Sequence, residues 1–157
     1  MTEPILRRTA RVLPVNRRGE VLLLQDQDPA VPGVLRWGTA GGGVDEGESL
    51  LEAAVRELRE ETGIVANAEQ LGAPIHTNQV VFSWSGVKYL GHSTFFALAV
   101  DGGVAVSFDG LEPLEVGNVL AARWWTPEAL AASGEEAWPG LCDIMRLAID
   151  TVRQGVQ

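Results

Sequence analysis

The segment RELREETG, from Arg56 to Gly63, places three glutamates within five residues, namely Glu57, Glu60 and Glu61. In a helix, residues three and four apart share one face, and each like-charged pair costs about 0.2 to 0.5 kcal/mol. Mg²⁺ prefers oxygen ligands and commonly bridges carboxylates to substrate phosphates. A cation bound by these glutamates would explain why the chain gathers them, so the spacing predicts a metal site on one helix face.

Three consecutive glycines, Gly41 to Gly43, lie shortly before this segment. Glycine removes the side chain where the chain must turn or approach another group closely. Beside a metal site, such a run would let backbone carbonyls and amides reach the cation and a phosphate chain. A plain flexible turn is the alternative interpretation of an isolated run of this kind.

The helix that carries the glutamates has recognisable ends. Ser49 followed by Glu52 is a capping-box pair, and Gly63 falls where a left-handed C-terminal cap belongs. These signals predict a helix from about Leu50 to Thr62, with the glutamates on a stripe next to its apolar face. The apolar residues that recur at helical spacing are Leu51, Ala54, Val55 and Leu58.

The remaining elements predict an α/β (α+β) fold in which a mixed β-sheet is sandwiched between helices. Strands and helices alternate along the chain without a repeat or a break in composition, so residues 1–157 are expected to form a single domain. The predicted strands cover 9–15 and 20–26, which form a hairpin, and 74–84, 88–100 and 118–125; the predicted helices cover 126–133 and 139–154, the latter starting at Pro139.

The order of these residues resembles the signature of the Nudix hydrolases, GX5EX7REUXEEXGU, where U is aliphatic. The chain fills it completely: Gly42 is followed after five residues by Glu48, and after seven more by the run from Arg56 to Ile64. Residues 36–49 and 122–130 also look like Nudix sequence. The resemblance therefore implies a Nudix fold over most of the chain, although Ala40 stands where many members have proline.

The resemblance also implies roles for the glutamates. It assigns Glu57, Glu60 and Glu61 to the binding of catalytic Mg²⁺, for which Mn²⁺ can substitute, helped by the carbonyl of Gly41. The implied reaction is attack of water on phosphorus in a pyrophosphate bond, with the metal lowering the pKa of that water. The expected function is a metal-dependent pyrophosphohydrolase acting on a nucleoside di- or triphosphate or a nucleoside-diphosphate derivative.

Two further roles are implied for residues beside the metal. Arg56 would hold a carboxylate in place, and Glu48 would support the loop. The general base is left open between Glu57 and Glu115, since members of the family use either a glutamate of the signature or one on a distant loop; Glu112 is a weaker candidate. Arg56, Glu57 and Glu115 are thus the expected catalytic residues.

The substrate is expected to touch the glycine run and an aromatic ring. Gly42 and Gly43 would approach the phosphates, and Trp37 or Trp84 would stack on the nucleobase, although packing in the core is the favoured alternative for each tryptophan. In the strand ending at Trp125, neighbouring tryptophans should lie on opposite faces.

Several substrate classes stay open. A Nudix-like sensor that binds a nucleotide without cleaving it is one alternative, but such proteins typically lose glutamates of the signature. Dinucleoside polyphosphate and ADP-ribose hydrolases are others. Their usual Tyr or Pro, fifteen to seventeen residues after the signature, is absent, because residues 78–81 are Asn, Gln, Val and Val.

Composition narrows the remaining possibilities. The 157 residues carry a formal net charge of −9, which repels a long phosphate backbone, so no nucleic acid polymer is expected as partner. Neither a membrane span nor a secretory signal is apparent, so we expect a cytoplasmic protein. The single cysteine, Cys142, excludes an internal disulfide. A homodimer is possible on the resemblance alone.

Overall fold

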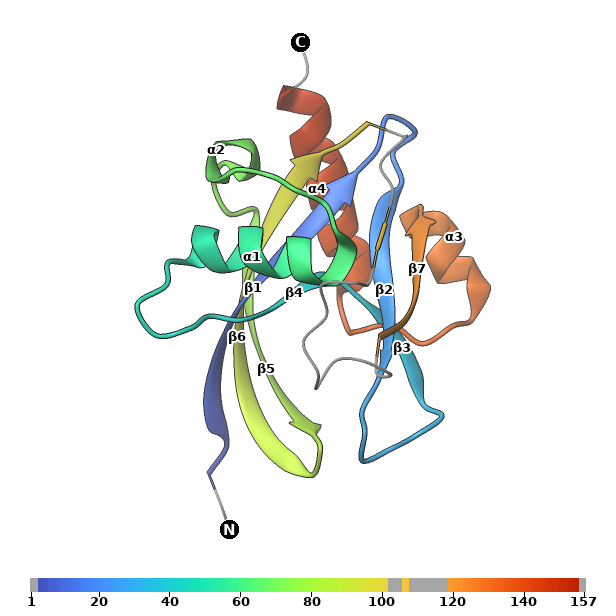
Figure 1. Cartoon of the computed structure of the whole chain (residues 1–157). Helices are drawn as coiled ribbons and strands as arrows, with labels where there is room; N and C mark the ends of the chain where they lie inside the picture. The colour runs from blue at the N-terminus through green and yellow to red at the C-terminus, as the bar shows by residue number, and fades with distance from the viewer. Residues whose placement is uncertain (1–2, 102–105, 108–118, 156–157) are drawn as a thin grey trace.

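A mixed, curled β-sheet forms the centre of the protein, with helices on both faces (Figure 1). The computed structural model describes residues 3–101, 106–107 and 119–155. Within these ranges the sheet has seven strands: β1 Ile5–Val15, β2 Val21–Gln27, β3 Leu35–Gly38, β4 Ala40–Gly43, β5 His76–Trp84, β6 Val87–Ala99 and β7 Val119–Trp125.

Strand β1 organises the sheet because it pairs along both of its edges. One edge runs parallel to β6 over its whole length, from the pair Ile5 and Tyr89 to the pair Val15 and Ala99. The other edge pairs antiparallel with the glycine strand β4 and reaches β2 only at Val15. The predicted hairpin is therefore right at its turn, but β2 then diverges to pair with β3 and β7.

The helix that bears the glutamates has the predicted bounds. Helix α1 spans Leu50–Thr62, the Ser49 side chain accepts a hydrogen bond from the Glu52 amide, and the Glu52 side chain accepts one from the Ser49 amide. Gly63 ends the helix in the left-handed conformation, with φ 78°. Local capping thus determines both ends of α1.

Three further helices complete the described fold: α2 Ala68–Leu71, α3 Pro127–Ser133 and α4 Leu141–Gly155. Helix α4 begins two residues later than predicted, because Pro139 and Gly140 form a turn in which Gly140 has φ 79°. No helix among the described residues is long and apolar enough to cross a membrane.

The core lies in two layers, one on each face of the sheet. Residues of β1 alternate between them: Val12 packs in the layer beneath α1, and Leu13 packs in the layer beneath α4. Trp124 and Trp125 alternate in the same way. The predicted sheet between helices is therefore confirmed, and α1 is held against β4 and β1, the strands that it needs to form a site.

Candidate active site

Two of the three clustered glutamates of α1 are buried against the glycine strand. Glu57 and Glu61 expose only 7% and 5% of their surface. A Cβ on Gly42 would lie 2.6 Å from Glu57 Oε1, so only glycine leaves room for that carboxylate. The backbone amide of Gly41 donates to Glu61 Oε1 at 2.9 Å. The glycine run is thus a strand packed closely against α1 and β1, not a flexible turn.

Arg56 ties the acidic groups together. It donates two parallel hydrogen bonds to Glu48, from Nε to Oε2 at 2.8 Å and from Nη2 to Oε1 at 2.9 Å. Its Nη1 reaches Glu57 Oε1 at 3.0 Å and Glu60 Oε2 at 3.2 Å, and its Nη2 reaches the carbonyl of Gly43 at 2.9 Å. The guanidinium holds the pKa of Glu48 below its ordinary value, and that contact raises its own pKa.

Arg11 contacts the glycine strand from the neighbouring strand β1. Its Nη1 donates to the Gly41 carbonyl at 3.0 Å, and its Nε donates to Thr9 Oγ1 at 3.3 Å. The Thr9 hydroxyl is in turn hydrogen-bonded to the Ser93 hydroxyl, with 2.8 Å between the two oxygens. Burial lowers the pKa of Arg11, while the nearby Glu61 raises it. The carbonyl assigned to a metal by the resemblance is therefore in contact with a buried arginine.

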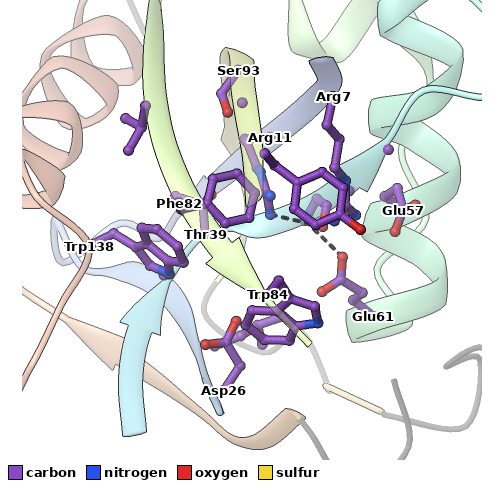
Figure 2. Close-up of a pocket in the computed structure, with 18 of the residues that line it drawn as sticks. Arg7, Arg11, Asp26, Thr39, Glu57, Glu61, Phe82, Trp84, Ser93 and Trp138 are labelled. Carbon is purple, nitrogen blue, oxygen red and sulfur yellow. Dashed lines mark hydrogen bonds between the residues drawn. The ribbon is translucent and has the colours of Figure 1, made fainter. Parts of the chain in front are cut away.

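The carboxylates and the glycine strand open into a cavity of about 830 Å³ (Figure 2). The positive side chains on its wall belong to Arg7, Arg11 and Arg56. Its aromatic wall comes from alternate residues of β5, from β6 and from the segment before α4, namely Phe82, Trp84, Tyr89 and Trp138. This cavity joins acidic, basic and aromatic groups in a volume typical of a small-molecule site.

The aromatic wall is closely packed. The Phe82 ring stacks on Tyr89 at a centroid distance of 5.5 Å and meets Trp138 edge-on at 5.7 Å. Two glycines make room for these rings, since a Cβ on Gly91 would lie 2.8 Å from Phe82 and one on Gly38 would lie 2.8 Å from Trp138. The shape of the wall is therefore set by contacts among these rings and glycines.

Trp37 does not line this cavity. It exposes 3% of its surface, meets Trp125 edge-on in the core, and donates from its indole nitrogen to Glu135 at 3.2 Å. The prediction that Trp37 could stack on a base is corrected accordingly, because its ring is covered by the sheet and by the segment before α4. Trp84, the other candidate, does line the cavity.

A family profile described as the NUDIX domain matches residues 5–142, which is most of the chain. The chain belongs to the Nudix hydrolase family. The acidic face of α1, the glycine strand and the arginine between them are the folded form of the family signature in this chain.

Comparisons with individual proteins agree with this assignment. A Nudix hydrolase of Rhodococcus erythropolis, orf19, is 34% identical over 117 residues, which are 71% of this chain and 57% of that protein. An RNA pyrophosphohydrolase of Cereibacter sphaeroides is 50% identical over 52 residues, 33% of this chain and 30% of that protein. The aligned parts thus span 57% and 30% of the length of these two curated relatives.

Solved structures show the same fold. The E. coli dihydroneopterin triphosphate pyrophosphohydrolase superposes with a TM-score of 0.66 at 21% identity, covering 94% of this chain and 99% of that one. Identity at this level shows the fold alone, and the fold does not determine the substrate of this Nudix protein.

The structure brings most of the predicted site residues of this Nudix protein together. The walls of the cavity include Gly41, Gly42, Gly43, Arg56, Glu57 and Glu61, and Glu60 is joined to them through Arg56. Glu115 and Glu112 lie outside the described residues. The roles assigned to all of these residues stay predictions.

Sequence reasoning missed the part of the site contributed by β1, β2, β6 and the segment before α4. The missed residues are Arg7, Arg11, Asp26, Tyr89, Ser93 and Trp138. These residues belong to no motif in the sequence, and the alternation that a strand such as β5 shows, with every second residue from His76 to Trp84 partly covered, would not have found them. Alternation shows that a strand has two faces, but it does not show which face lines a cavity.

Proposed function

We propose that this Nudix protein is a divalent-metal-dependent pyrophosphohydrolase that cleaves a phosphoanhydride bond in a nucleoside di- or triphosphate or a nucleoside-diphosphate derivative. The observation that carries the proposal is the cavity itself. Glu57 and Glu61 of α1 share it with Arg7, Arg11 and a wall of aromatic rings. A nucleotide needs these three environments, because it combines phosphates, a metal and a base.

Glu57, Glu60 and Glu61 are the residues proposed to hold the metal, which we expect to be Mg²⁺, with Mn²⁺ as substitute. Members of the family generally use divalent metal ions. The chemistry of the donors suits such a cation, since they are carboxylate oxygens on one helix face, beside a glycine whose missing Cβ leaves room for the Glu57 carboxylate.

Arg56 is the group that a cation would have to compete with. Its Nη1 lies between oxygens of Glu57 and Glu60, and no three acidic, histidine or cysteine side chains of the described ranges converge on one metal position. A cation at this helix face would therefore take over part of the charge compensation that the guanidinium now provides. Arg56 keeps its paired bonds to Glu48 as an anchor.

The phosphates are proposed to lie between α1 and the arginines of β1. Arg7 reaches the cavity beside Gly43, and Arg11 lies beside Gly41, so both cations border the glycine strand. The bound metal would neutralise phosphate charge and lower the pKa of the attacking water. The water oxygen bonds to phosphorus, the bridging oxygen leaves with the electron pair of the broken bond, and the water proton passes to a carboxylate, for which Glu57 and Glu115 are the candidates.

The test is hydrolysis of a panel of nucleoside di- and triphosphates, nucleotide sugars and dinucleoside polyphosphates, in Mg²⁺, in Mn²⁺ and in EDTA. We expect hydrolysis with metal and none in EDTA. Glu61→Gln should abolish it, whereas Glu128→Gln, the same change at an exposed position of α3, should leave it unchanged. Metal-independent hydrolysis, or full activity of Glu61→Gln, would refute the proposal. Tight nucleotide binding with no hydrolysis would identify a sensor instead.

A further inference from the structure

A partly buried carboxylate, that of Asp26, lies at the aromatic end of the cavity, and the proposed reaction does not use it. Asp26 lies on β2, opposite Arg36 of β3, and its side chain lines the cavity. Figure 2 shows it next to Trp84 and on the side away from Glu57. Its Oδ1 is buried and has no hydrogen-bond partner among the described residues. A buried acceptor without a partner is costly, so its position beside a ligand cavity needs an explanation.

The charges around Asp26 leave it able to accept hydrogen bonds at neutral pH. Burial raises its pKa to about 6, against the opposing effect of Arg11 and Arg36, and the nearby Asp28 raises it further. The carboxyl is therefore mainly ionised at pH 7.5. An ionised carboxylate is an acceptor at both oxygens and donates nothing, so its partner must present N–H or O–H groups.

The surroundings restrict that partner to the edge of a flat ring. Trp84 and Trp138 border the cavity beside Asp26, and Arg36 stacks on Trp138 at 3.9 Å from the ring centroid. Aromatic rings of this kind hold a nucleobase by its faces and leave its edge to polar groups. With phosphates at the glycine strand, the base of a bound nucleotide would point its edge towards Asp26.

Among the common bases, guanine alone presents two adjacent donors, N1–H and the 2-amino group, which match the two oxygens of a carboxylate once Oδ1 of Asp26 turns from its buried position towards the cavity. Adenine and cytosine place a ring acceptor beside their amino group, and uracil flanks its single N–H with carbonyls. We propose that Asp26 is a specificity residue that selects guanine nucleotides in this cavity. This inference rests on the proposed function, which places the phosphates at the glycine strand and therefore the base near Asp26. It adds to that function the class of base that the substrate carries.

The test measures binding alone, so that it does not depend on catalysis. Calorimetric titrations in EDTA would compare GMP, IMP, AMP and XMP on the full chain. GMP should bind about tenfold or more tightly than IMP, which lacks the 2-amino group, and than AMP. This comparison needs no variant.

Asp26→Asn then provides a gain of binding that a structural role would not produce. Asparagine offers one acceptor and one donor, which match N1–H and the 2-carbonyl of xanthine, so the preference should change from GMP to XMP. The matched control is Asp143→Asn, at a carboxylate that is 87% exposed on α4, and it should bind like the unmodified chain.

The outcomes separate this inference from the proposed function. Equal affinity of the unmodified chain for GMP, IMP and AMP, or no measurable binding of any of them, would overturn the inference. A folded Asp26→Asn variant that still prefers GMP to XMP would do the same. If the chain prefers GMP but hydrolyses no compound of the panel above, the proposed function is refuted, while the proposed selection of guanine by Asp26 still holds.

Discussion

Replacing Asp26 with asparagine should stabilise the protein at neutral pH. The carboxylate is mainly ionised there although it is partly buried and its buried Oδ1 lacks a hydrogen bond among the described residues. Asparagine keeps nearly the same shape and removes the charge. If Asp26 serves ligand binding, it is maintained at the expense of stability, which is common at functional sites.

The pKa shift gives the size of the effect. Burial and neighbouring charges raise the pKa of Asp26 from an ordinary value of 3.8 to about 6. Each pKa unit corresponds to about 1.4 kcal/mol, so the ionised group lowers the free energy of unfolding by about 3 kcal/mol. The sign follows from proton binding: between these two pKa values the folded chain holds more protons than the unfolded chain. Stability due to Asp26 is therefore greatest below pH 3.8, falls as the pH rises to about 6, and is constant above.

Urea unfolding at pH 4.0 and pH 7.5 measures this difference. Relative to the unmodified protein, Asp26→Asn should gain up to about 3 kcal/mol more at pH 7.5 than at pH 4.0. Asp143→Asn, at an exposed carboxylate, should show little pH-dependent difference. A difference between Asp26→Asn and the unmodified protein that is the same at both pH values would refute the reasoning, because an unperturbed carboxyl would behave in that way.

Three further substitutions test the acidic face of α1. Glu61→Gln should lower kcat by orders of magnitude while the circular dichroism spectrum stays unchanged, and a folded, fully active variant would contradict the proposed role. Gly42→Ala should place a Cβ 2.6 Å from Glu57 Oε1, which we expect to destabilise the protein by about 1 to 3 kcal/mol in thermal unfolding and to reduce activity. Unchanged stability would show that the helix can move away. Glu48→Gln should reduce stability more at pH 7 than at pH 3, because contact with Arg56 lowers the pKa of Glu48 and the resulting stabilisation is lost as the carboxylate is protonated. Equal destabilisation at both values would point to packing instead.

The helix of the signature could be predicted residue by residue because its determinants are local. Ser49, Glu52 and Gly63 act within one turn of each end of α1, and the structure has them as caps. Other element boundaries that depend on nearby residues were also close, although Pro139 precedes α4 within a turn and does not begin the helix. Short-range chemistry therefore transfers from sequence to structure with few errors.

The cavity could not be predicted in the same way, because it depends on which strands pair. Asp26 faces Trp84 and Trp138 only because β2 leaves β1 after one residue pair and continues beside β3 and β7. Arg11 borders the acidic face of α1 only because β1 pairs with the glycine strand. Nothing in the local sequence of either residue marks it as part of a site.

Three glycines can be recognised in the sequence, but their role in the cavity depends on the tertiary structure. The sequence predicted that the missing side chain at Gly42 would allow a close approach to the substrate phosphates; in the structure the group packed against Gly42 is the carboxylate of Glu57. Gly38 and Gly91 do the same for Trp138 and Phe82 on the aromatic wall. Since a Cβ at each of these three positions would push against a side chain that lines the cavity, each glycine helps to set the form of the cavity and not only the path of the backbone. Both ends of the proposed site therefore depend on glycines that leave room for a side chain of the cavity wall. Alanine at Gly42 would perturb the metal end, and alanine at Gly38 or Gly91 would perturb the base end.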